Sequence, residues 1–66
     1  MDYIDMHIIK IIKDILFNID KYNINILTLC DNLYINSDDF INLLNNPVRN
    51  ISLYLGILEE VKNEGV

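Results

Sequence analysis

Apolar residues recur through the first third of the chain at the spacing of one helix face. Six of them occupy an arc of about 100° at the helical period, and two more widen it to about 160°. They do not alternate with a period of two, as a half-buried strand would require. We therefore expect an amphipathic helix over residues 3–20. The stripe consists of Ile4, Ile8, Ile11, Ile12, Ile15 and Ile19, flanked by Ile9 and Leu16.

Polar segments then divide the chain into further helical stretches. Asn25 is placed to cap a helix over residues 26–33, because its side chain can accept hydrogen bonds from the first helical turn. Residues 34–36 are expected to form a turn, after which Ser37 is placed to cap the next helix.

Pro47 and Gly65 set the ends of the two later helices. The residue before a proline is pushed out of the α region, so the helix after the turn should end at about Asn45. Asn50 is placed to cap a last helix from residue 51 to about residue 63, where Gly65 is positioned to stop it. The sequence predicts an all-α fold in which residues 1–66 form one small domain of four helices.

Residues 26–45 carry the apolar template of two helices packed across a short turn. A small residue beside an apolar one on the first helix lets the second helix approach closely. Apolar residues must also close the first helix, follow the turn and recur three apart on the second helix. Leu29 and Cys30 are the apolar and the small residue, and Leu33 closes the first helix. Ile35 follows the turn, Ser37 is the cap, and Phe40 and Leu43 are the pair on the second helix.

This pattern resembles the helix-turn-helix of the Cro/CI-type phage repressor superfamily, and with the flanking helices the resemblance spans nearly the whole chain. The resemblance implies a dimer that binds DNA with the second helix. The chain departs from the family in two ways, because Tyr34 stands where glycine is usual and two aspartates would face the DNA backbone. Either Tyr34 adopts a positive φ at a conformational cost, or the turn has another shape. The DNA contacts that the resemblance implies are Asn36, Ser37, Asn42 and Asn45 near bases and Arg49 near a phosphate.

The charge balance points away from nucleic acid. The chain has ten acidic residues against five basic ones, for a formal net charge of −5. Affinity for DNA rests mainly on neutralising phosphates with Lys and Arg, so a chain without a basic patch lacks the main electrostatic contribution. An acidic surface suits a basic protein instead. The candidate partner-binding residues are Asp31, Asp38 and Asp39.

Other residues that carry chemistry are isolated. His7 has no second histidine to complete a metal site, and Cys30 has no base beside it to make it a nucleophile. We therefore expect no enzyme activity, no cofactor and no metal. No stretch approaches 18 apolar residues and the first residues are acidic, so we expect neither a membrane span nor a signal peptide, and a cytoplasmic location.

The last helix is apolar over about 200° of its circumference, more than the roughly 100–140° that a helix on a small bundle needs. A surplus of this kind marks an interface, and a domain of this size often needs a partner to be stable. The sequence therefore predicts a homodimer. The residues predicted at its interface are Leu53, Tyr54, Ile57, Leu58 and Val61.

Two functional hypotheses follow from these patterns. The first is a non-enzymatic regulatory protein, from a phage or other mobile element, that acts by protein–protein contact as an anti-repressor or as an inhibitor of a host or defence protein. The alternative is a dimeric helix-turn-helix transcriptional regulator that binds DNA.

Overall fold

The computed structural model describes residues 2–65, and these form four helices without a strand. Helix α1 spans Tyr3–Lys21, α2 spans Ile26–Leu33, α3 spans Ser37–Asn45 and α4 spans Ile51–Glu64. The bounds agree with those predicted from the apolar periodicity to within one residue at each end. The all-α prediction is therefore confirmed.

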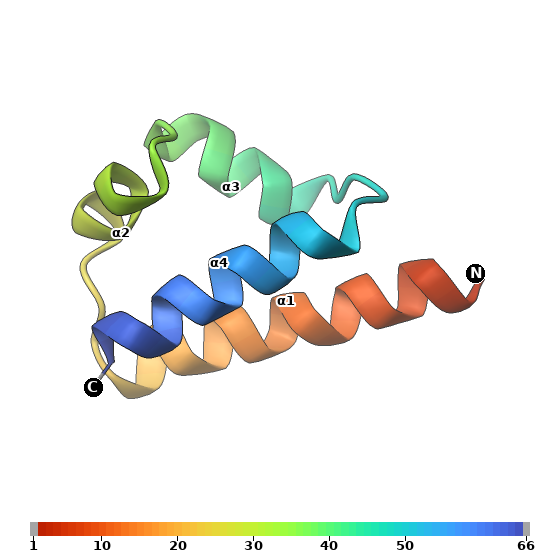
Figure 1. Cartoon of the computed structure of the whole chain (residues 1–66), viewed down its shortest axis with the longest axis horizontal. Helices are drawn as coiled ribbons and strands as arrows, with labels where there is room; N and C mark the ends of the chain where they lie inside the picture. The colour runs from red at the N-terminus through yellow and green to blue at the C-terminus, as the bar shows by residue number, and fades with distance from the viewer. Residues whose placement is uncertain (1, 66) are drawn as a thin grey trace.

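Helix α4 lies at the centre of the arrangement. It runs beside α1 in the same direction, and α2 and α3 cover its other side (Figure 1). Helix α4 contacts α1 on one side and α2 on the other, so apolar residues on both sides of α4 are buried within the chain. The wide apolar arc of the last helix is thus explained within one chain.

Three of the five residues predicted at a dimer interface belong to the core of the single chain. Tyr54 and Val61 have no exposed surface, and Ile57 is 2% exposed. That part of the prediction is wrong. The apolar width of the last helix was compared with that of a helix buried on one side, whereas α4 is buried on two sides. Leu53 and Leu58 are partly buried and pack against the same core.

The core joins all four helices. Its α1 members are the centre of the isoleucine stripe, and both residues of the small-residue site on α2 are buried in it. Burying apolar side chains contributes about 25 cal/mol to the free energy of unfolding for each Å² of apolar area removed from water. The buried residues are Ile8, Ile11, Ile12, Ile15, Leu29, Cys30, Phe40, Tyr54, Ile57 and Val61.

The Tyr54 hydroxyl ties α4 to the end of α3. It donates a hydrogen bond to the Leu43 carbonyl at 2.7 Å and accepts one from the Val48 N–H at 3.0 Å. The ring fills the core while the hydroxyl satisfies two backbone groups that helix α3 and the following loop leave without a helical partner. Tyr54 therefore positions α3 and the loop after it relative to α4.

Asparagine side chains cap three of the helices. The Oδ1 atoms of Asn25 and Asn50 accept backbone N–H groups of the first turns of α2 and α4, as predicted. At α3 the cap is Asn36, whose Oδ1 accepts the Asp39 N–H at 2.8 Å. The prediction of Ser37 as the cap is wrong by one position, because Asn36 is still extended and Ser37 is the first helical residue.

Candidate protein-interaction surface

The turn between α2 and α3 has the geometry of a Schellman motif. The Tyr34 N–H donates to the Asp31 carbonyl at 3.2 Å, and the Ile35 N–H donates to the Cys30 carbonyl at 3.1 Å. These bonds satisfy carbonyls at the end of α2, and Ile35 packs against the core. The motif sets the direction in which α3 leaves α2.

Tyr34 occupies the position in this motif that glycine usually fills. Its φ of 60° and ψ of 37° place it in the left-handed region. A residue with a Cβ atom pays roughly 1–2 kcal/mol there. The side chain does not offset this cost by packing, because Tyr34 is 94% exposed. The fold thus holds a large aromatic side chain out in solvent at the tip of the α2–α3 turn.

Two further apolar side chains are exposed on the helices that flank Tyr34. Leu27 on α2 is 65% exposed and Ile41 on α3 is 50% exposed. Leu27 lies in the first turn of α2, seven residues before Tyr34, and Ile41 lies in α3, seven residues after it. Sequence reasoning did not select these two residues, although their places outside the apolar stripes of α2 and α3 mark them as exposed.

The three predicted partner-binding carboxylates are all exposed on this same part of the chain. Asp31 lies in the last turn of α2, and Asp38 and Asp39 lie in the first turn of α3. No lysine or arginine occurs between residues 22 and 48, so no basic side chain within this segment offsets their charge. We refer to the exposed side chains Leu27, Asp31, Tyr34, Asp38, Asp39 and Ile41 as the α2–α3 surface.

The residues implied in DNA contact are placed less favourably for that role. Asn36 is occupied as the α3 cap, and the Asn42 side chain accepts a hydrogen bond from the Asn46 amide at 2.9 Å. Ser37 is partly buried, and Asn45 is exposed.

Arg49, which follows α3 in the chain, is paired with Asp2, the N-cap of α1, and with Asp5 in its first turn. Its Nη2 atom lies 2.7 Å from Asp2 Oδ2, and its Nε atom lies 3.5 Å from Asp5 Oδ1. Pairs this exposed contribute at most about 1 kcal/mol each. They nevertheless hold the guanidinium against two carboxylates, which lowers its capacity to neutralise a phosphate.

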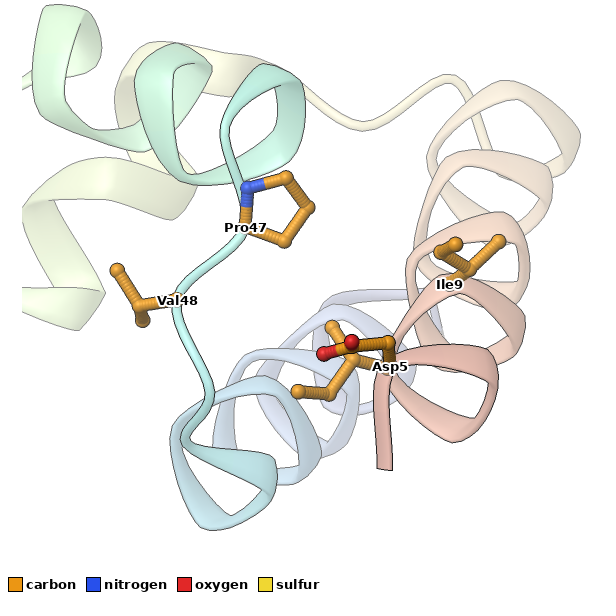
Figure 2. A pocket seen from close by; sticks show the side chains of 5 residues that line it. Asp5, Ile9, Pro47 and Val48 are labelled. Atoms are coloured by element: carbon orange, nitrogen blue, oxygen red, sulfur yellow. The ribbon is translucent and has the colours of Figure 1, made fainter. Parts of the chain in front are cut away.

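A hollow of about 470 Å³ lies between α1 and the loop that joins α3 to α4. Asp5, Ile8 and Ile9 line it from α1, and Pro47 and Val48 line it from the loop (Figure 2). The walls are mainly apolar and the one polar side chain is the Asp5 carboxylate. The lining contains no nucleophile and no base beside one, so this hollow suits an apolar side chain rather than a reaction.

The potential metal ligands do not gather in the described part of the chain. Among residues 2–65, no group of three His, Cys, Asp or Glu side chains is arranged to hold a metal ion. Cys30 is buried, and burial together with the nearby Asp31 carboxylate raises the pKa of its thiol. A thiol in this environment is held in its neutral, unreactive form.

Comparison with known proteins places this arrangement in no family. No family model matches the chain, and no curated protein or solved structure shows significant similarity to it. None of the helices described is long and apolar enough to cross a membrane.

Proposed function

We propose that the protein is a small non-enzymatic regulator that binds a basic surface of another protein through its α2–α3 surface. One observation carries the proposal: three exposed carboxylates flank an exposed tyrosine in sequence, in a segment that contains no basic residue. Carboxylates of this kind steer and pair with Lys and Arg. The partner is therefore expected to present basic residues around an apolar site.

Tyr34 is the expected anchor of this contact. Tyrosine is enriched among the residues that dominate binding energy at protein interfaces, because it buries a large apolar area and keeps a polar hydroxyl. Its ring can also take an arginine or lysine over its face, with Asp31 and Asp38 close in sequence on either side of it. Binding would cover a side chain that the free chain holds in solvent at a conformational cost.

The biological role that best fits is that of an anti-repressor or an inhibitor of a host or defence protein, encoded by a phage or another mobile element. The basis is analogy with other small, acidic, helical proteins of such elements, which act by occupying a partner. Binding alone is sufficient for this role, so it needs no catalytic group.

The alternative is a helix-turn-helix regulator that binds DNA as a dimer. The three-residue Schellman turn between α2 and α3, with Asn45 exposed on the second helix, favours it. The acidic first turn of α3 and the pairing of Arg49 with Asp2 weigh against it. DNA affinity would require phosphate neutralisation that this surface does not offer.

Affinity capture from lysate of the host in which the gene occurs, followed by mass spectrometry, tests the first role. The variant Asp31→Asn/Asp38→Asn should lose a partner that the unmodified chain retains at low salt. The matched control Asp20→Asn/Glu59→Gln changes the net charge equally, outside the α2–α3 surface, and should retain it. Equal capture by both variants would refute the proposed surface.

The DNA alternative is tested with the same proteins by fluorescence anisotropy on labelled random duplex DNA. We expect no binding at about 10 μM chain and 50 mM salt, conditions under which non-specific DNA binders associate. Binding that weakens steeply as salt is raised, and that is lost in Arg49→Gln, would favour the DNA-binding role and contradict the protein-binding role.

A further inference from the structure

The outward side of α1 carries a stripe of exposed apolar and basic side chains. Tyr3, Met6, Lys10, Lys13 and Phe17 follow one another at alternating steps of three and four residues, which keeps them on one helix face. Met6 is 59% exposed and Phe17 is 64% exposed. We refer to these five residues as the α1 stripe. By helical phase, the stripe lies on the side of α1 opposite to the buried residues Ile8, Ile11, Ile12 and Ile15.

The α1 stripe contains two of the five basic residues of the protein, Lys10 and Lys13. With Lys21 at the end of the helix, α1 contains three of the five basic residues of the protein. Within residues 2–65, none of these three lysines forms an ion pair, because both ion pairs there involve Arg49. The acidic residues Asp14 and Asp20 flank the stripe on the same helix. The Lys21 ammonium lies 5.9 Å from the Phe17 ring centroid and 5.2 Å from that of Tyr22, so Lys10 and Lys13 are the lysines that can meet carboxylates from outside the chain.

The surface around the stripe is hollowed on both sides. One shallow hollow is lined by Tyr3, Met6 and Lys10 together with His7, Ile11 and Asp14. The other is lined by Met6, Ile9, Lys10 and Lys13. Hollows next to exposed Met6 can receive apolar side chains from a second surface while the lysines reach its charged groups.

The α2–α3 surface of the same protein has the complementary composition. It combines exposed Leu27, Tyr34 and Ile41 with three carboxylates and no basic residue, whereas the α1 stripe combines exposed apolar side chains with lysines. Helix α1 lies on one side of α4 and helices α2 and α3 lie on the other, so the α1 stripe and the α2–α3 surface do not meet within one chain (Figure 1). Two α1 stripes facing each other would oppose lysine to lysine, which is repulsive.

We propose that the α1 stripe of one molecule docks on the α2–α3 surface of a second copy. Such a contact joins two different patches, so it repeats head to tail and either closes into a ring or grows into a chain. This inference rests on the α2–α3 surface of the proposed function and extends it to regulation. Self-association covers the surface that would bind the basic partner, so the two contacts exclude each other.

Two neutralised variants test the head-to-tail arrangement by sedimentation equilibrium between about 10 μM and 1 mM chain. Lys10→Gln/Lys13→Gln damages the α1 stripe, and Asp38→Asn/Asp39→Asn damages the α2–α3 surface. The weight-average mass of the unmodified protein should rise with concentration beyond that of a dimer. Each variant alone should associate at least about tenfold more weakly, a loss of roughly 1.4 kcal/mol.

An equimolar mixture of the two variants gives the decisive result. Each variant keeps one intact patch, so the mixture should form a complex of one copy of each and stop at twice the mass of one chain. Circular dichroism of each variant checks that its helices are retained. The exposed pair Glu59→Gln/Lys62→Gln on α4 is the control and should associate like the unmodified protein.

Several outcomes would overturn the proposal. They are an unmodified chain that stays monomeric at 1 mM, growth that neither variant reduces, and a wild-type mass that stops at two copies. These experiments use the chain alone, so their failure leaves the partner capture test standing. Conversely, Lys10→Gln/Lys13→Gln weakens self-association but keeps the α2–α3 surface, so partner capture by this variant tests the proposed function independently of self-association.

Discussion

Replacing Tyr54 with phenylalanine isolates the role of one hydroxyl in this fold. The substitution keeps the ring, which has no exposed surface, and so preserves core packing. It removes the hydrogen bonds to the Leu43 carbonyl and from the Val48 N–H. Both backbone groups would then lie in a partly buried position without a protein partner.

The expected cost follows from these two bonds. Leaving a buried donor or acceptor without its partner costs about 1–3 kcal/mol, and partial access of water keeps the total for this pair within that range. The whole free energy of unfolding of a domain this size is about 3–10 kcal/mol. Tyr54→Phe should therefore remove a large fraction of the stability while the native helices still form.

Urea unfolding followed by circular dichroism measures this loss. With a slope of about 1 kcal/mol per molar urea, the midpoint should fall by roughly 1–3 M. Amide exchange at Val48 should accelerate, because its N–H loses its acceptor. The control Tyr3→Phe removes a hydroxyl from an exposed side chain and should shift the free energy of unfolding by less than about 0.5 kcal/mol. An unchanged midpoint and unchanged Val48 exchange in Tyr54→Phe would refute the reasoning.

Three other substitutions or treatments have expected outcomes. Gly56→Ala should raise the free energy of unfolding by about 0.5–1 kcal/mol, because a Cβ there meets open space within a helix; a lower thermal midpoint would contradict this. Tyr34→Gly should raise the free energy of unfolding by roughly 1 kcal/mol, since glycine adopts positive φ freely, and should weaken partner capture. Urea unfolding measures the first effect and affinity capture the second, and a destabilised variant would refute the strain argument. Burial and Asp31 raise the pKa of Cys30, so the folded thiol ionises at higher pH than the unfolded one. The stability that this shift contributes is therefore present below the unfolded pKa and is lost as pH rises through the folded pKa. Iodoacetamide labelling at pH 8 should be slower in buffer than in denaturant, and equal rates would show an accessible thiolate.

The apolar periodicity was sufficient to predict the helices. The isoleucine spacing in residues 3–20 and the template in residues 26–45 are local patterns, and a helix is held by local hydrogen bonds that such patterns specify. Asn25 and Asn50 were recognisable as caps for the same reason. Asn36 and Ser37 are both good capping residues, so the sequence does not decide which of them caps α3. The extended backbone angles of Asn36 in the structure identify it as the cap.

The tertiary structure decided which apolar residues are available to a partner. Tyr54, Ile57 and Val61 lie on a helix whose width indicated an interface, yet they are enclosed because α4 packs on both sides. Exposure of the apolar side chains on α1 follows from the same packing, since only one side of that helix meets α4.

The sequence by itself determined the helices and the acidity of the α2–α3 segment, because these depend on neighbours along the chain. The conformational cost of Tyr34 was one of two possibilities, and its φ of 60° in the structure decided between them. Only the tertiary structure decided that Arg49 meets Asp2 and that the Tyr54 hydroxyl meets Leu43 and Val48. The first of these contacts joins residues 47 positions apart. No helical or turn periodicity relates residues so distant, and their meeting depends on how the packed core orients each helix.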